Sequence, residues 1–445
     1  MMPMRSIGFA VVVTFALAFG EISPAAHAQT VAAGYVLEQN CPNLSATFIN
    51  NVIDSYLTTP QAASWNIGQV AFSRDGTKLY LTYAPGARSP GQVHVRDIAT
   101  CTQKALITNI EGPLGIAVHP RTGNLYITHR YVNPSWVDGT SPAYQKIRSA
   151  ISIYNPTTGA LLVDKWVKGF APSIPFGVPA NGDVGNGLQG LTFDRAGNLY
   201  GVPNLDVWET DSQPAGCAAT SSCDFWATGP LYKITPQGRV SEFATGFRAS
   251  FEAVIAKTNL YGEATAFYAG DNGEGLFCGG NGCNDRSVPG ATPPRSLTRQ
   301  YYDELNYVLP GGHYGYPESA STVAFDQANT PLGEEGAYKS HLGPLWNFER
   351  ANGIGFTGTP TAVWPVPTGV ALVQGDWGHV KDPLFMTFWL GARLDMFTGL
   401  NRSERTTLVN NLPGRGTDVL VCPASGEVWF VEDSTRVVWK IRPAY

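Results

Sequence analysis

The sequence predicts an all-β fold, a six-bladed β-propeller built from four-stranded antiparallel sheets. Two observations lead to this prediction: the composition of the chain and a pattern that recurs along it. Charged residues make up only 15% of the 445 residues, while the chain has 49 Gly and 32 Pro. This composition is typical of a β protein with many turns.

The recurring pattern is a small residue, an apolar pair, a turn that ends in Gly, and then an apolar and aromatic strand. The alternating apolar residues indicate two paired strands, and the Asp-Gly, Thr-Gly, Ala-Gly or Ser-Gly corner supplies the turn between them. Clear copies cover residues 68–81, 115–127, 190–201 and 418–430, and weaker copies begin near Glu252 and Gly369.

The spacing of these copies favours radial repetition. Gly68 and Gly115 are 47 residues apart, and Gly369 and Thr417 are 48 residues apart. A propeller blade takes about 40–50 residues, so six copies predict six blades around a central channel. The alternative is a β-sandwich with chance similarity between its hairpins, which the even spacing disfavours. The longer gaps imply insertions, and we expect residues 133–149 and 275–300 to form loops over one rim.

The first 28 residues have the pattern of an export signal. Arg5 provides a positive charge, residues 7–20 are apolar, and Ala26-His27-Ala28 is a small-x-small cleavage site. We therefore expect a secreted or periplasmic protein with a single propeller domain over residues 29–445. Within it, residues 29–62 are predicted to be an N-terminal extension with one short helix, from Ser45 to Leu57. No later apolar stretch is long enough to predict a membrane span.

The seven cysteines of an exported chain favour disulfides over free thiols. Cys217 with Cys223 and Cys278 with Cys283 would each close a short loop. A third bridge joins Cys41 to Cys101 or, equally well, to Cys422. No His accompanies these pairs at the spacing of a zinc site.

The charge pattern excludes one class of partner. The net charge is -5 and no cluster of Lys or Arg is present, so nucleic acid is not an expected partner.

Two stretches carry the densest chemical information. The first is Gly270-Asp271-Asn272-Gly273-Glu274-Gly275, and the second is the block from Asp303-Glu304-Leu305-Asn306 through Pro310-Gly311-Gly312 to Tyr314-Gly315-Tyr316-Pro317. Glycines allow close approach of the backbone to a ligand or ion. Carboxylates, amide oxygens and backbone carbonyls are the hard donors that Ca²⁺ prefers. For Asp303 and Glu304 the alternative is a structural role, capping a strand turn by bonding backbone amides.

Together the two stretches resemble the loop-and-strand block of the soluble quinoprotein glucose/sorbosone dehydrogenase family, six-bladed propellers that bind pyrroloquinoline quinone (PQQ). The resemblance is strongest from Leu231 to Pro317 and resumes from Trp364 to the C-terminus. It implies that backbone carbonyls of Gly273 and Glu274, with Asp271 nearby, hold the Ca²⁺ that bridges to the quinone. It leaves Asp303 and Glu304 as candidates for a second, structural ion.

PQQ carries three carboxylates, so its pocket requires fixed cations. Arg suits this role because its planar guanidinium pairs with carboxylates through two hydrogen bonds and stays charged. The candidates are Arg248, Arg393 and Arg415, since Arg248 and Arg415 lie in segments that match the family's Arg-containing segments. The alternative for each is an ion pair at the rim or between blades.

Sugar oxidation also requires a general base for the hydroxyl proton. The family uses a His shortly before the inner strand of the third blade, but residues 183–190 of this chain contain no His, and Asn186 falls closest to its position. The catalytic candidates here are therefore Asp183 and His129.

The predicted function is a secreted, PQQ- and Ca²⁺-dependent dehydrogenase that oxidises an aldose or a related sugar. Because the expected His is missing, the alternative is a non-catalytic, Ca²⁺-stabilised propeller that binds carbohydrate or protein. A third possibility is a Ca²⁺-dependent hydrolase similar to the six-bladed lactonases, with Asn186, Asn204 and Asp271 converging on an axial metal.

Overall fold

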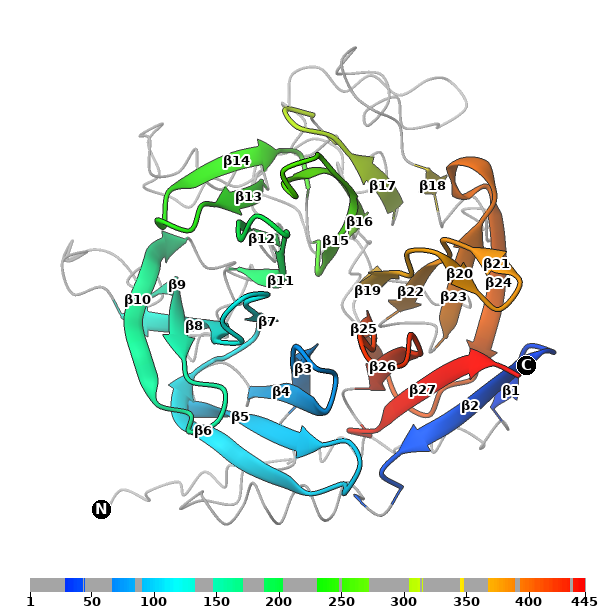
Figure 1. Cartoon of the computed structure of the whole chain (residues 1–445), viewed down its shortest axis with the longest axis horizontal. Coiled ribbons are helices and arrows are strands. Elements are labelled where there is room, and N and C mark those ends of the chain that lie inside the picture. The colour runs from blue at the N-terminus through cyan, green and yellow to red at the C-terminus, as the bar shows by residue number, and fades with distance from the viewer. Residues whose placement is uncertain are drawn as a thin grey trace, which may run out of the picture.

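The structure is a computed structural model of the whole chain (Figure 1). It describes residues 29–42, 44, 66–84, 90–132, 147–170, 188–202, 230–247, 250–271, 304–312, 314, 345–347, 367–388, 393–432 and 435–444. All structural statements below concern these residues.

Six antiparallel sheets of at least four strands stand in a ring around a common axis, which confirms the predicted six-bladed propeller (Figure 1). Blade 1 consists of β3 (Asn66–Phe72), β4 (Lys78–Ala84), β5 (Pro90–Asp97) and β6 (Gln103–Glu111). Blade 2 consists of β7 (Ile116–Val118), β8 (Leu125–Val132), β9 (Ile147–Tyr154) and β10 (Leu161–Phe170). Blade 3 consists of β11 (Gln189–Phe193), β12 (Leu199–Val202), β13 (Leu231–Ile234) and β14 (Val240–Ala244).

The second half of the ring follows the same order. Blade 4 consists of β15 (Ala253–Thr258), β16 (Ala264–Asp271), β17 (Glu304–Val308) and β18 (Trp346–Asn347). Blade 5 consists of β19 (Pro367–Leu372), β22 (Leu384–Phe388), β23 (Leu394–Thr398) and β24 (Glu404–Asn410), with a short hairpin of β20 (Asp376–Trp377) and β21 (Val380–Lys381) and a 3₁₀ turn, η7 (Leu400–Arg402). Blade 6 contributes β25 (Gly416–Val421), β26 (Val428–Glu432) and β27 (Val438–Pro443).

The N-terminal strands close the ring. β2 (Tyr35–Asn40) is the outermost strand of blade 6, where it pairs antiparallel with β27 over its whole length, and β1 (Thr30–Val31) adds a fifth strand to blade 5 (Figure 1). The first half of the predicted N-terminal extension is therefore part of two blades. The ring is consequently held shut by strand pairing between the two ends of the chain.

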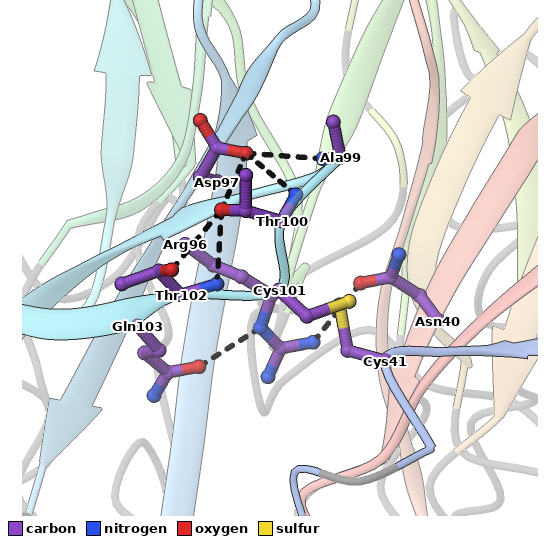
Figure 2. The surroundings of a disulfide bond; sticks show 9 residues. All are labelled: Asn40, Cys41, Arg96, Asp97, Ala99, Thr100, Cys101, Thr102 and Gln103. Atoms are coloured by element: carbon purple, nitrogen blue, oxygen red, sulfur yellow. Dashed lines mark hydrogen bonds between the residues drawn. A yellow bond between two sulfur atoms is a disulfide. The ribbon is translucent and has the colours of Figure 1, made fainter.

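A disulfide reinforces this closure. Cys41 directly follows β2 and bonds to Cys101, which lies in the turn between β5 and β6 of blade 1 (Figure 2). Of the two pairings that the sequence left open for Cys41, the structure contains this one, and Cys422 is a free, buried thiol. Beside the bridge, the buried Arg96 donates to Gln103 Oε1 at 2.8 Å and to Asn40 Oδ1 at 3.3 Å. The cross-link thus joins the last blade to the first.

The hydrophobic core is divided into six clusters, and each cluster fills one interface between neighbouring blades. Phe72 of blade 1 meets Trp429 of blade 6, for example, and Tyr200 of blade 3 meets Phe267 of blade 4, with ring centroids 5.3 and 4.7 Å apart. Both faces of each inner sheet are therefore buried, which explains why the inner strands are apolar at consecutive positions rather than at alternate ones.

The repeated corners of the sequence are hairpin turns, as predicted. Gly76, Gly123, Gly197 and Gly426 all have a positive φ, between 69° and 94°, a conformation that glycine adopts without steric cost. In blade 1, Asp75 fixes the corner by accepting hydrogen bonds from Ser73 Oγ and from the Thr77 amide and hydroxyl. These bonds lower the pKa of Asp75 to about 2.

Several sequence predictions lie outside the described residues: the export signal at 1–28, the helix at 45–57, the loops at 275–300 and nearly all of those at 133–149, and the cysteines of the two short loops. Among the residues that are described, no α-helix occurs, and no helix is long and apolar enough to cross a membrane.

Candidate functional site

Those predicted site residues that the structure describes lie toward one face of the ring because of the strand order within each blade. The first strand of every blade begins at this face, the second strand ends there and the third begins there. We call it the mouth face. Asp271 is the last residue of β16, Glu304 is the first residue of β17, and Arg393 and Arg415 directly precede β23 and β25. His129 lies in the second half of β8.

The two motif stretches meet at the mouth face of blade 4. The register of β16 and β17 pairs Gly270 with Leu305 and Asp271 with Glu304. Glu304 is buried and its Oε2 accepts a hydrogen bond of 3.2 Å from Asn306 Nδ2. The Asn306 Oδ1 atom is buried and receives no hydrogen bond from any described residue. Blade 4 therefore presents a buried carboxylate and an unsatisfied amide oxygen side by side, both of them hard oxygen donors.

The remaining predicted metal residues are not tested. Gly273, Glu274 and Asp303 lie outside the described residues, as does the side chain of Asp271. Within the part of the chain that is described, no group of three or more His, Cys, Asp or Glu side chains could hold a metal ion.

Arg393 belongs to a cluster of two arginines, Arg393 and Arg405, around a single acid, Asp395. Asp395 is fully buried, and its Oδ2 atom lies 3.0 Å from Arg393 Nε and 3.1 Å from Arg405 Nε. Thr407 Oγ1 donates to the other carboxylate oxygen at 2.8 Å. The Arg393 guanidinium also lies over the Phe388 ring, 4.5 Å from its centroid. The Arg405 guanidinium lies 5.9 Å from the centroid of the Trp346 ring of blade 4. The cluster carries one more positive charge than negative charge.

One nitrogen of this cluster is unsatisfied. Arg393 Nη2 is buried and has no hydrogen-bond partner among the residues that the structure describes. Burial lowers the pKa of Arg393, and the adjacent Asp395 raises it. A buried N–H group of a cation without an acceptor is costly, so this atom fits an additional anionic group.

The other two predicted arginines are less informative. Arg415 is exposed at the start of β25, and Arg248 lies outside the described residues. The structure therefore does not test whether Arg248, Arg393 and Arg415 converge.

His129 is engaged inside blade 2. Its Nδ1 lies 2.9 Å from the Arg130 carbonyl oxygen and its Nε2 lies 2.8 Å from Ser152 Oγ. A carbonyl can only accept, so Nδ1 carries the proton and Nε2 accepts the hydrogen bond of the Ser152 hydroxyl. Burial lowers the pKa of His129, which keeps the ring neutral at pH 7. Since Ser152 is fully buried, this lone pair is occupied within the blade.

Two acids near the ring axis, Glu252 and Asp418, were not among the residues predicted from the sequence. Glu252 Oε2 accepts a hydrogen bond of 2.8 Å from the Val370 amide, and Asp418 Oδ2 accepts one of 2.7 Å from the Val70 amide. Val370 directly follows Gly369, and Gly369 packs against the Asp418 backbone, so the two carboxyl groups lie beside each other. Burial and the Asp418 charge raise the pKa of Glu252 well above its ordinary value, and burial raises the pKa of Asp418 to about 7.

A signal for these acids was present in the repeat. The residue before each apolar pair is Gly in three copies (Gly115, Gly190 and Gly369) but an acid at positions 252 and 418. Because this position is the one nearest the axis, two acids there are brought together by the closing of the ring.

No protein-family model and no curated protein sequence matches the chain, but solved structures share its fold. One solved structure, "glucose dehydrogenase", is 15% identical, with a TM-score of 0.54 over 86% of this chain and 97% of that one. A second, "Crystal structure of glucose dehydrogenase", is 16% identical, with a TM-score of 0.53 over 84% and 95%. The PQQ domain of a pyranose dehydrogenase from Coprinopsis cinerea is 12% identical, with a TM-score of 0.49 over 93% and 97%. At 15% and 16% identity, the likeness to the first two structures shows the propeller fold.

Proposed function

We propose that this protein is an exported dehydrogenase that uses PQQ and Ca²⁺ to oxidise an aldose or a related sugar. The observation that carries the proposal is the unsatisfied Arg393 Nη2 in a cluster with surplus positive charge at the mouth face. A tri-anionic cofactor supplies the acceptor that this nitrogen lacks. The shared fold with glucose dehydrogenases, over nearly the whole length of both chains, supports the same function.

The residues present fit the two groups that this function requires. Arg393, with Arg415 and Arg248, would hold the carboxylates of PQQ through hydrogen bonds assisted by charge. The carbonyls of Gly273 and Glu274, with Asp271 nearby, would hold the Ca²⁺ that acts with the quinone. Glu304 and the Asn306 Oδ1 atom, with Asp303, would contribute oxygen donors to a second, structural ion at blade 4. When bound, the quinone would accept the hydride of the sugar.

The chain itself must provide the group that takes the hydroxyl proton. Of the two predicted candidates, His129 already accepts a hydrogen bond from Ser152, and that bond would have to break before the ring could act as a base. We therefore assign the role to Asp183, with His129 as the second choice. In this assignment the D183N variant keeps cofactor binding and loses turnover by about 100-fold or more, because an amide cannot accept the proton.

The test of the function is reconstitution. Purified protein is mixed with PQQ and Ca²⁺, and reduction of a dye is followed with a panel of aldoses and sugar alcohols. The expected result is dye reduction that requires both additions and at least one sugar. Absence of both quinone absorbance in the desalted protein and dye reduction with every sugar would remove the proposal.

A second candidate function is a Ca²⁺-stabilised propeller that binds carbohydrate or protein without turnover. The specific support is that residues 183–190 contain no His and that the His129 lone pair is occupied. This function predicts a melting temperature that falls when a chelator is added, together with no dye reduction. Turnover in the reconstituted enzyme would exclude it.

A further inference from the structure

The inner strands of the ring are bridged to one another at one level of the axis. Gln69 of blade 1 accepts a hydrogen bond of 2.8 Å from the Gly190 amide of blade 3 and donates one of 3.1 Å to the Phe251 carbonyl, just before blade 4. The two acids extend this set of bridges between blades, because Glu252 accepts a hydrogen bond from the Val370 amide of blade 5 and Asp418 accepts one from the Val70 amide of blade 1. We call these three side chains, Gln69, Glu252 and Asp418, the axial hub.

Two glycines beside the hub pack closely against the backbone of the neighbouring blade. A Cβ atom added to Gly369 would lie 2.4 Å from the Val419 amide nitrogen, and one added to Gly190 would lie 2.7 Å from the Glu252 Cα. The glycines therefore allow the strands to approach closely enough for the two acids to meet.

The hydrogen bonds at the two acids leave room for one proton between them. One oxygen of each carboxyl group is bound to a backbone amide, which leaves one oxygen on each acid. Asp418 Oδ1 is buried, and no donor among the described residues reaches it. Two ionised carboxylates can only accept, so the hydrogen bond between Glu252 and Asp418 exists only when one of them is protonated.

We propose that Glu252 and Asp418 share one proton across the axis, and that this proton forms a pH-sensitive hydrogen bond that links blade 4 to blade 6. Below neutral pH the shared proton links the two blades. When the pH rises and the proton leaves, the half-buried Glu252 and the buried Asp418 both carry a negative charge, and the contact between them becomes repulsive. The inference does not depend on the proposed dehydrogenase activity.

No compensating cation lies in the described surroundings of the pair. The inner strands present only neutral side chains at this level: Gln69 from β3, Gly115 before β7, Gln189 and Gly190 from β11, Thr368 and Gly369 from β19, and Thr417 from β25. Arg415 is three residues before Asp418 but is exposed, and Arg248 lies outside the described residues. Among the described residues, the charge that acts on Glu252 is that of Asp418.

The direction of the pH dependence follows from the raised pKa values. A carboxyl group whose pKa is higher in the folded than in the unfolded protein binds its proton more tightly when folded, so stability falls as pH rises. The contribution is fully present below about pH 4, the ordinary Asp value. It is lost as the pH rises through about 7, the value for Asp418, and the raised pKa of Glu252 extends the loss to higher pH.

The test compares the pH dependence of melting in the wild type, in E252Q and in D418N. Each amide keeps the shape of the acid, accepts the backbone hydrogen bond, and donates from its NH₂ group to the remaining carboxylate at any pH. The wild type is expected to lose on the order of 5 °C in melting temperature between pH 5.5 and pH 8.5. Both variants should lose much less and should melt above the wild type at pH 8.5. The matched control is E263Q, which removes an exposed carboxylate and should keep the wild-type slope.

A second measurement keeps the proposal testable if a variant does not fold. Infrared difference spectra of the wild type should contain the C=O band of a buried protonated carboxyl group at pH 6.5, and the band should disappear at alkaline pH. Absence of that band at pH 6.5 would overturn the proposal, as would a wild-type slope that E252Q leaves unchanged. If Ca²⁺ restored the melting temperature at pH 8.5 in the wild type but not in E252Q, the pair would hold a cation instead of a proton.

Discussion

The disulfide between Cys41 and Cys101 is expected to be the largest single contribution to the closure of the ring. It joins the end of β2, the last strand of blade 6, to blade 1, and its two cysteines are 60 residues apart in the sequence. For a closed loop of that length, the chain-entropy relation gives about 4 kcal/mol at 25 °C. We therefore predict that the double variant C41S/C101S loses about 4 kcal/mol of unfolding free energy.

The assay is equilibrium unfolding in urea, followed by tryptophan fluorescence. The double variant is preferable to a reducing agent, because a reductant would also act on the other cysteines of the chain. C422A is the matched control, since Cys422 is buried but free, and its loss should cost about 1 kcal/mol.

A loss below about 1 kcal/mol in the double variant would refute this reasoning. It would mean that the six residue pairs between β2 and β27 hold the ring closed without the cross-link. A loss in C422A as large as that in the double variant would also refute it, since the effect would then come from core packing rather than from the bridge.

Two further predictions concern the close approach of blades 5 and 6 and the ion-pair cluster within blade 5. G369A should destabilise the ring by about 3 kcal/mol, because the new methyl group would collide with the Val419 backbone. The control G426A, whose added Cβ has open space around it, should cost about 1 kcal/mol from its positive φ alone. Equal losses of unfolding free energy in urea for the two variants would contradict the close approach of Gly369 to Val419. D395N should lower the unfolding free energy by about 3 kcal/mol, since it leaves the two largely buried guanidinium groups of Arg393 and Arg405 without their acid. A change below about 1 kcal/mol, measured by thermal melting, would show that charge does not stabilise this cluster.

Much of the fold could be predicted because its determinants are local. Each hairpin corner, such as Asp75-Gly76 or Ser425-Gly426, places a turn residue and a glycine between two apolar strands, and the structure contains a turn at each. The pairing of β2 with β27 could not be predicted in this way. It joins residues about 400 positions apart, and nothing within residues 35–40 identifies their partner.

The candidate site shows the same division between local and long-range information. Asp395 lies in β23 and Arg393 directly precedes that strand, two residues earlier, so both side chains lie on one face and their ion pair is local in the sequence. The surplus charge at that pair comes from Arg405, which reaches it only through the pairing of β23 with β24. Glu252 and Asp418 come from different blades, and only the closed ring brings them together.

The pairing of Cys41 was likewise open in the sequence. Cys101 and Cys422 are both single cysteines outside the short loops. The structure distinguishes them because Cys422 packs in the cluster between blades 6 and 1, whereas Cys101 lies in a turn beside the end of β2.

The central claim, that the mouth face binds a tri-anionic quinone through Arg393, is tested most directly by calorimetric titration of PQQ in the presence of Ca²⁺. R393M and R405M form a matched pair, because each removes one arginine from the same carboxylate, but only Arg393 carries the unsatisfied nitrogen. We predict binding of one PQQ per chain, weakened at least tenfold in R393M and much less in R405M, which corresponds to about 1.4 kcal/mol for the charge-assisted hydrogen bond. No binding to the wild type, or equal weakening in both variants, would contradict the claim.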